Sequence, residues 1–246
     1  MSEQRAQTVV VTGAARGVGR AVALRFAGAG ANVVAADVEA LDETEAGAAE
    51  LRGACLGVLA DVRDRAQVAG MVATAEERFG PLDVLICNAA ISFPDPFLEI
   101  TRERWDDVLS VNLGGALSAC QAALPSMTER GQGSVVIMSS IAGRRASVSN
   151  GAHYTCSKYA LIGLTRHLAI ELAGTGVRVN SVAPGPVDTP LLTEHTSEDE
   201  RAAIVERMPL GRIGSPEDVA EVVFFVASPA ARQMHGAVLD VNGGMH

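Results

Sequence analysis

Short runs of β-branched and apolar residues alternate with longer helical patterns from one end of this chain to the other. The runs cover Thr8–Thr12, Asn32–Asp37, Cys55–Asp61, Leu82–Asn88, Ser134–Ser139 and Val177–Ala183. Strands with so few polar positions are typical of a sheet that is covered on both faces, because neither face then meets water. The alternation of strand and helix predicts parallel strands joined by right-handed crossovers.

Helical patterns fill the intervals between the predicted strands. They cover Gly17–Ala29, Ala40–Leu51, Arg63–Phe79, Thr101–Arg130 and Ala152–Ala173, and a last helix near Pro216–Ala227 precedes a strand near Ala237–Val241. No linker, repeat or low-complexity tract divides the chain. The sequence therefore predicts an α/β fold, with one domain over residues 1–246 and a doubly wound parallel sheet that carries helices on both faces.

One polar stretch, Thr193–Arg207, interrupts this alternation. It follows the end of a predicted strand, where α/β proteins carry loops that close over ligands. We therefore predict a substrate loop over residues 188–212.

The composition limits the partners that the chain can have. Apolar residues make up 48% of the 246 residues, which is enough for a sizeable core. The formal charge of −9 argues against a nucleic-acid partner or an anionic membrane surface, because both require a basic face. We find no apolar run of about 18 residues, which a membrane span needs, and no signal peptide, so we expect a cytoplasmic protein.

The four cysteines, Cys55, Cys87, Cys120 and Cys156, are scattered without a Cys-x-x-Cys pair. No histidine lies at metal-ligand spacing from them. Reduced thiols and the absence of a bound metal are the simplest interpretation.

A glycine-rich turn, Thr12–Gly19, joins the first predicted strand to the first predicted helix. It reads TGAARGVG, with glycines at Gly13, Gly17 and Gly19. Such glycines let the backbone turn sharply and approach a pyrophosphate at the helix N-terminus, where free N–H groups favour negative charge. The spacing G-x-x-x-G-x-G differs from the general dinucleotide fingerprint, so the turn by itself is also compatible with an ordinary loop.

Acidic residues at the ends of the next two predicted strands strengthen the nucleotide interpretation. Asp37 lies about twenty residues beyond the glycines, where a carboxylate can hold the hydroxyls of an adenosine ribose. The same carboxylate would repel a 2′-phosphate and favours NAD over NADP, whereas Arg16 weakly favours the opposite choice because it can reach such a phosphate. Asp61, followed by Val62, is compatible with a border of the adenine or with a helix N-cap.

Tyr154 and Lys158 lie one helical turn apart on the same face of a predicted helix. An ammonium beside a phenol stabilises the phenolate and lowers its pKa from about 10. Ser140 ends a strand and can donate a hydrogen bond to a substrate oxygen, while Asn112 lies in a helical segment where a buried amide is unusual for packing alone. A Tyr-x-x-x-Lys pair also occurs on many surface helices, so the set gains meaning only from its order with the glycine turn and the strand-end acids.

This combination resembles the short-chain dehydrogenase/reductase family over essentially the whole chain, which implies a Rossmann-type fold. Two departures are visible, because Cys87 and Ala90 replace the first asparagine and the glycine of the NNAG motif; both replacements are small and leave the implied activity intact. The matching motifs are TGxxxGxG at Thr12–Gly19, NNAG at Cys87–Ala90, the helix asparagine at Val111–Leu113, the serine region at Met138–Gly143, YxxxK at Tyr154–Lys158 and the PG motif at Asn180–Thr189.

The resemblance implies a role for each matched residue. Tyr154 would be the general acid/base, and Lys158 would lower its pKa and bind the nicotinamide ribose. Ser140 would orient the substrate oxygen, and Asn112 would hold a water in a proton relay to Lys158. The implied dinucleotide site comprises Gly13, Arg16, Gly17, Val18, Gly19, Asp37, Asp61, Val62, Asn88, Ala89, Tyr154, Lys158, Pro184, Gly185, Val187 and Thr189.

Candidates for the substrate pocket come from loops at the carboxyl ends of the predicted strands. Arg144 and Arg145 are compatible with binding a carboxylate or phosphate of the substrate, although paired arginines more often face solvent or a subunit contact. His153 can reach the pocket, although packing or solvent exposure is the commoner outcome. The candidates are Ser92, Phe93, Phe97, Arg144, Arg145, Asn150, His153, Leu191, Leu192 and His195.

The resemblance predicts an NAD(H)-dependent oxidoreductase that interconverts a secondary alcohol and a ketone by hydride transfer, with NADP less favoured. An NADPH-dependent 3-oxoacyl-carrier-protein reductase of the same family stays open, although Asp37 argues against it. A non-catalytic dinucleotide-sensing regulatory protein is the alternative of another class, and the proton-relay residues argue against that. By analogy with relatives, we expect a homotetramer or homodimer formed through the helices Thr101–Arg130 and Ala152–Ala173.

Overall fold

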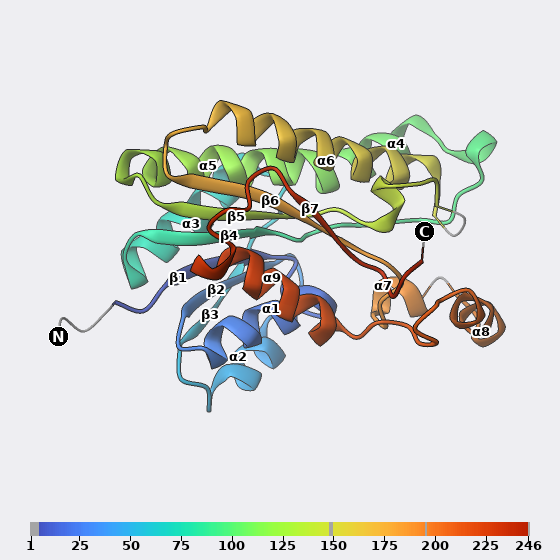
Figure 1. Cartoon of the computed structure of the whole chain (residues 1–246), viewed down its shortest axis with the longest axis horizontal. Helices are drawn as coiled ribbons and strands as arrows, with labels where there is room; N and C mark the ends of the chain where they lie inside the picture. The colour runs from blue at the N-terminus through green and yellow to red at the C-terminus, as the bar shows by residue number, and fades with distance from the viewer. Residues whose placement is uncertain (1–4, 148–149, 195, 246) are drawn as a thin grey trace.

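The computed structural model describes residues 5–147, 150–194 and 196–245. Its centre is a parallel sheet of seven strands in the order β3-β2-β1-β4-β5-β6-β7 (Figure 1). This arrangement confirms the predicted doubly wound α/β sheet. The strands are β1 Thr8–Thr12, β2 Asn32–Asp37, β3 Cys55–Leu59, β4 Leu82–Cys87, β5 Gly133–Met138, β6 Val177–Pro184 and β7 Val238–Val241.

The strand order changes direction between β1 and β4, and this change positions a cleft. From β1 the chain moves outward through β2 and β3, then returns to β4 and continues to β7 on the other side. Val11 pairs with Ala35 of β2 and with Ile86 of β4, so the carboxyl ends of these three parallel strands lie side by side. Connections that leave β1 and β4 run to opposite faces, which opens a crevice between them at the carboxyl ends.

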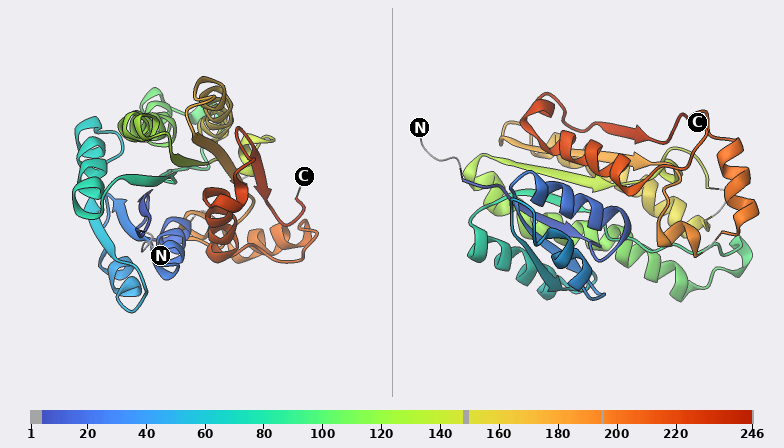
Figure 2. Two further views of the ribbon diagram at one scale, coloured as in Figure 1. Left: turned by 60° about the vertical axis from the view of Figure 1, so that its left-hand side comes forward. Right: turned by 90° about the horizontal axis from the view of Figure 1, so that it is seen from below.

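Two helical layers cover the sheet, as Figures 1 and 2 show from three directions. Each layer closes its own apolar core, with Phe26 and Val223 buried in one and Met71 and Met127 in the other. The burial of both faces explains why the strands are apolar along almost their whole length. One layer consists of α1 Gly17–Gly28, α2 Asp42–Ala48 and α9 Pro216–Ala227, and the other of α3 Arg65–Phe79, α5 Gly115–Arg130 and α6 Ala152–Glu171.

The helix predicted over Thr101–Arg130 has three parts. α4 Arg102–Leu109 and α5 are joined by one π-helical turn at Ser110–Gly114. By length and composition, the continuous segment Arg102–Arg130 is apolar enough to cross a membrane, which the sequence reading had not found. One face of α5 is buried in the same core cluster as α3 and β4, and 39% of the most apolar window of this segment is buried.

The polar stretch predicted as a loop is largely helical, which corrects the sequence reading. It forms α7 Pro190–Thr193 and α8 Glu198–Glu206. α8 begins with a capping box in which the Ser197 side chain accepts from the Glu200 N–H and the Glu200 side chain accepts from the Ser197 N–H. The helix signal therefore lies in the cap, whereas the charged sequence that follows suggested a loop.

Three predicted strands end earlier than expected. β3 stops at Leu59 rather than Asp61, β4 at Cys87 rather than Asn88, and β5 at Met138 rather than Ser139. Asp61, Asn88 and Ser139 line the cleft just beyond these strand ends. Three 3₁₀ turns complete the elements that the structure describes: η1 Phe97–Glu99, η3 Ile141–Gly143 and η4 Pro229–Ala231.

Candidate active site

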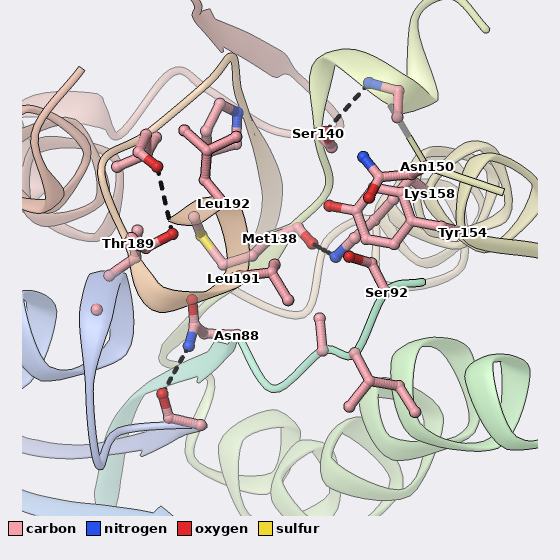
Figure 3. A pocket seen from close by; sticks show the side chains of 18 of the residues that line it. Asn88, Ser92, Met138, Ser140, Asn150, Tyr154, Lys158, Thr189, Leu191 and Leu192 are labelled. Atoms are coloured by element: carbon pink, nitrogen blue, oxygen red, sulfur yellow. Dashed lines mark hydrogen bonds between the residues drawn. The ribbon is translucent and has the colours of Figure 1, made fainter. Parts of the chain in front are cut away.

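A cavity of about 500 Å³ opens at the carboxyl ends of the strands. We call one part of the cavity the glycine end and the part lined by Tyr154 together with α7 and α8 the tyrosine end. The glycine end is lined by Gly13, Arg16, Gly17, Val18, Gly19, Asp37 and Asp61. Figure 3 shows the tyrosine end, where labelled side chains from α6 and α7 lie on opposite sides of the space. The cavity is therefore formed jointly by both halves of the doubly wound sheet.

The glycine turn is packed too closely for a side chain at two of its positions. Gly13 has a φ of +67°, and a Cβ there would lie 2.7 Å from the Ala89 Cα. A Cβ on Gly19 would lie 1.9 Å from the Gly13 carbonyl oxygen. Gly17 instead faces the opposite wall of the cavity, where a Cβ would lie 3.2 Å from Thr189 Cγ2. Gly13 and Gly19 thus permit the close packing of the turn, and Gly17, whose φ of +57° also favours glycine, preserves space across the cavity.

The N-terminus of α1 forms a cradle that fits a phosphate. N–H groups in the first turn of a helix have no intrahelical partner, and the N-cap residue Arg16 makes no side-chain cap hydrogen bond. Gly17, Val18 and Gly19 all line the cavity at this point. Backbone N–H groups and the helix dipole both favour an anion here, so these residues fit the pyrophosphate of a dinucleotide.

The Asp37 carboxylate is held in one orientation at the end of β2, where it lines the cavity. Its Oδ2 accepts a hydrogen bond from the Ala15 N–H at 2.9 Å. Its Oδ1 accepts from the N–H groups of Val38 at 2.7 Å and Glu39 at 3.2 Å. Three backbone donors from two segments thus place a carboxylate beside the phosphate cradle, where an adenosine ribose would lie.

The Arg16 guanidinium lies between two carboxylates. Its Nη1 is 2.8 Å from Glu194 Oε1, and its Nη2 is 3.4 Å from Glu39 Oε1. Both pairs are about half exposed and add little to the free energy of folding. These pairs nevertheless place two carboxylates around Arg16, which is the residue predicted from the sequence to be able to bind a 2′-phosphate.

Asp61 and Val62 line the cavity after β3. Asp61 binds the Arg63 guanidinium, with its Oδ2 2.7 Å from Nη2, and this hydrogen bonding keeps the pKa of Asp61 below its ordinary value. The alternative that Asp61 caps the next helix is wrong, because Asp64 is the N-cap of α3 and accepts from the N–H groups of Ala66 and Gln67.

Asn88 ties the end of β4 to the glycine turn. Its Nδ2 donates to the carbonyl oxygens of Thr12 and Gly13, at 3.0 Å each. Thr12 Oγ1 accepts in return from the N–H groups of Asn88 and Ala89. These bonds are why a strand-end asparagine is needed here. On the far wall, four PG-motif residues also line the cavity: Pro184, Gly185, Val187 and Thr189.

Tyr154, Lys158 and Ser140 meet at the tyrosine end (Figure 3). The first turns of α6 bring Tyr154 and Lys158 to one face, with the Lys158 Nζ 5.5 Å from the centroid of the Tyr154 ring. The Nζ donates a 2.9 Å hydrogen bond to the Met138 carbonyl oxygen at the end of β5. Ser140 follows that strand, and its Oγ accepts from the Ala142 N–H at 3.1 Å. Strand β5 and helix α6 therefore position all three groups.

The pKa values of this set differ from the sequence expectation. Burial raises the pKa of Tyr154, and a hydrogen bond with Ser140 only partly offsets this effect. Burial also lowers the pKa of Lys158 to about 8. Desolvation is the main cause of both shifts, because both groups are almost fully enclosed.

Asn112 lies in the π-helical turn between α4 and α5 and is fully hydrogen-bonded. Its Nδ2 donates to the Ile91 carbonyl oxygen and to Ser157 Oγ, both at 3.0 Å, and its Oδ1 accepts from the Ile91 N–H at 2.8 Å. It is buried but does not belong to the cavity lining. Its side chain joins the segment after β4 to α6, while the implied water relay stays a prediction.

The predicted pocket residues divide into two groups. Arg144 is turned away from the cavity, since its Nε lies 2.9 Å from Asp240 Oδ1. Phe97 is 71% exposed, and Phe93 lies under the Arg104 guanidinium, so neither lines the cavity. His153 is fully buried and accepts from the Tyr154 N–H, and His195 lies outside the described residues. The candidates that do line the cavity are Ser92, Arg145, Asn150, Leu191 and Leu192.

Ser92 is unusual among them. Its side chain is 3% exposed, and its Oγ has no hydrogen-bond partner among the residues that the structure describes. An unpartnered buried hydroxyl costs about 1–3 kcal/mol. Because Ser92 faces the cavity beside Lys158 (Figure 3), a bound oxygen or water can supply the missing partner.

Several residues that line the cavity were not predicted from the sequence. Ile204 and Arg207 come from α8, which the sequence reading treated as a loop without assigned side chains. Met245 comes from the chain end, beyond β7. Only the capping box of α8 could have pointed to a helix there, and nothing in the sequence indicated which of its faces meets the cavity.

Comparison with known proteins agrees with this geometry. A family model described as enoyl-(acyl carrier protein) reductase matches residues 13–246. The chain is 40% identical over 247 residues to a cis-4-hydroxycyclohexanecarboxylate dehydrogenase of Sinomonas cyclohexanicum, covering 99% of this chain and 98% of that protein. It is 39% identical over 238 residues to a 3-oxoacyl-[acyl-carrier-protein] reductase of Thermotoga maritima, covering 96% of each.

A solved structure agrees with the fold described above. The crystal structure of a short-chain type dehydrogenase/reductase from Mycobacterium marinum has a TM-score of 0.93 at 32% identity, covering 98% of this chain and 96% of that one. The fold and the site thus define a dinucleotide-binding oxidoreductase. The chain belongs to the short-chain dehydrogenase/reductase family.

Proposed function

We propose that this protein is an NAD(H)-dependent oxidoreductase that interconverts a secondary alcohol and the corresponding ketone. The observation that carries the proposal is that Tyr154, Ser140 and Lys158 share one cavity with the glycine turn and the Asp37 carboxylate. A phosphate cradle at one end and a proton-transfer group at the other suit hydride transfer coupled to proton transfer.

The choice of NAD rests on the charges at the glycine end. The Asp37 carboxylate is oriented by three backbone N–H donors, and Glu39 follows it in the cavity lining. A 2′-phosphate at this point would meet negative charge, and Arg16 is already engaged by Glu39 and Glu194. A ribose hydroxyl, in contrast, can donate to the carboxylate.

Each residue at the tyrosine end has a distinct task in the proposed reaction. A bound nicotinamide supplies the hydride donor or acceptor. Tyr154 gives a proton to the substrate oxygen during reduction and takes it back during oxidation. Ser140 hydrogen-bonds the same oxygen and holds it near the phenol. Lys158 is fixed by its bond to Met138, and its ammonium stabilises the phenolate that forms.

A second candidate is an NADPH-dependent 3-oxoacyl-carrier-protein reductase. The similarity to the Thermotoga maritima reductase and the description of the matching family model favour it. The same catalytic residues would serve that reaction, so the two candidates differ in dinucleotide and substrate. The carboxylates around Arg16 favour the first candidate.

Steady-state oxidation of a panel of alcohols, with NAD⁺ and NADP⁺ in parallel, tests the proposal. The panel includes secondary alcohols, sugars, steroids and hydroxy acids, and 3-oxoacyl thioester reduction is measured with NADH and NADPH. We expect secondary-alcohol oxidation at a higher kcat/KM with NAD⁺. Reduction of the thioester with a strong NADPH preference would favour the second candidate, and dinucleotide binding without any turnover would favour a sensor.

A further inference from the structure

The charged residues that line the cavity are distributed unevenly between its two ends. At the glycine end, Asp37, Glu39 and Asp61 supply carboxylates beside Arg16 and Arg63. At the tyrosine end, the described lining contains the cations Lys158, Arg145 and Arg207 but no carboxylate. In a chain with a formal charge of −9, a cation-only surface of this kind favours an anionic ligand.

Arg144 and Arg145 are neighbours in the turn after β5, but only one of them lines the cavity. Arg144 leaves the cavity to pair with Asp240 and to donate to the Val238 carbonyl oxygen, both on β7. Arg145 is half-buried and lines the cavity together with Ser147 and Asn150. The turn after β5 therefore places one arginine against strand β7 and the next in the cavity lining.

Arg207 approaches the same cavity from the C-terminal end of α8. Among residues 5–147, 150–194 and 196–245, no carboxylate lies within ion-pair distance of its guanidinium. Arg145, which also has a contact of its own within the protein, lines the same cavity from a different segment of the chain. Two arginines on separate elements of one cavity lining can each donate to an acidic group that is bound in that cavity.

Apolar side chains occupy much of the remaining lining at this end. Leu191 and Leu192 come from α7, Ile204 from α8, and Ile141 from η3. Such a surface suits a hydrocarbon body between the reacting carbon and the acidic group, because it removes apolar surface from water.

We propose that the substrate is an anionic hydroxy or oxo compound, with its acidic group bound by Arg145 and Arg207 and its reacting oxygen at Tyr154 and Ser140. This inference rests on the proposed function. A carboxylate and a phosphate ester share the required chemistry, because both present two oxygens to a guanidinium.

The test compares matched substrates that differ only in charge. Oxidation of 3-hydroxybutanoate, 4-hydroxycyclohexanecarboxylate and 4-hydroxycyclohexyl phosphate is measured with NAD⁺ against the primary amides of the two acids and against plain cyclohexanol. We expect kcat/KM at least tenfold higher for one of the anions than for its uncharged counterpart, and the acid and phosphate arms identify the favoured group.

Arginine variants then locate the effect. Arg145→Gln is expected to lower kcat/KM for the preferred anion about tenfold, and the more exposed Arg207→Gln about threefold, because solvent weakens its charge. The readout is the ratio of kcat/KM for the anion to kcat/KM for cyclohexanol, because an effect on folding or on dinucleotide binding changes both values alike. Arg144→Gln is the matched control, and it should leave the anion-to-neutral ratio unchanged.

Two outcomes overturn the inference in distinguishable ways. If amides and cyclohexanol are oxidised as well as the anions, or if Arg144→Gln lowers the ratio as much as Arg145→Gln, the anion site is wrong while alcohol oxidation stands. If no alcohol of either charge is oxidised with either dinucleotide, the proposed function fails, and the inference fails with it.

Discussion

The two ends of the cavity are built from different parts of the chain. At the glycine end, backbone groups and short side chains at strand termini form the surface, and bonds such as those of Asn88 to Thr12 and Gly13 lock them together. At the tyrosine end, beyond Tyr154, Ser140 and Lys158, longer side chains come from η3, α7 and α8. The first end suits one constant ligand, whereas the second can change substrate by side-chain substitution without disturbing the sheet.

This contrast predicts that substitutions at the tyrosine end separate chemistry from dinucleotide binding. Tyr154→Phe removes the proton donor and leaves the glycine end intact. We expect turnover to fall at least about a hundredfold, with the dissociation constant for NADH nearly unchanged. Stopped-flow and steady-state rates with a fluorescence titration of NADH measure both. Turnover near that of the wild type would reject Tyr154 as the acid/base.

The pH dependence should also belong to the tyrosine end. Oxidation needs the Tyr154 phenolate, and burial raises the pKa of Tyr154 above its ordinary value. Well below that pKa, the phenolate fraction grows about tenfold for each pH unit, so kcat/KM for alcohol oxidation should rise with pH. Near pH 8 the rise should flatten, because Lys158, with a pKa of about 8, then loses its ammonium charge. Oxidation that becomes faster on acidification would contradict this assignment.

A substitution at the glycine end should have the reverse selectivity. Asp37→Asn keeps the side-chain shape but removes the charge that would bind ribose hydroxyls and repel a 2′-phosphate. We expect KM for NAD⁺ to rise about tenfold, the typical value of a charged hydrogen bond, and the gap to NADP⁺ to narrow. KM for the alcohol should hardly change. An unchanged NAD⁺/NADP⁺ ratio would mean that Asp37 does not select the dinucleotide.

The smallest expected effect concerns the buried hydroxyl of Ser92. If its missing partner is the substrate or a water held with it, Ser92→Ala should raise KM for the alcohol several-fold at constant KM for NAD⁺. Removing an unpartnered buried hydroxyl should also leave thermal stability equal or slightly higher. A lower melting temperature with normal kinetics would instead show that Ser92 has a structural partner.

The parts of the site that sequence could predict are those in which neighbours along the chain act together. The glycine turn, the Asp37 strand end and the Tyr154–Lys158 pair each depend on local geometry, such as a helical turn or the start of a helix. The doubly wound parallel sheet followed for the same reason, since strand-helix alternation leaves few topologies open. Fold and reaction class were therefore within reach of the sequence.

Other residues were beyond its reach because their roles depend on distant partners. Arg144 and Arg145 are adjacent and chemically identical. Arg144 nevertheless lies outside the cavity lining, because it binds Asp240, which is 96 residues away along the chain. The pKa of Tyr154 depends on enclosure by several elements, and burial raises it above its ordinary value. The role of α8 as a cavity wall likewise has no local signal.

The sequence by itself determined a doubly wound sheet, a phosphate-binding turn and a phenol–amine pair, because each follows from spacing along one or two elements. Only the tertiary structure decided which of the two arginines lines the cavity, where Arg16 finds its carboxylates and in which direction burial shifts the pKa values of Tyr154 and Lys158. The physical reason is that charge, desolvation and side-chain direction are set by neighbours in space, and those neighbours come from segments far apart in the chain.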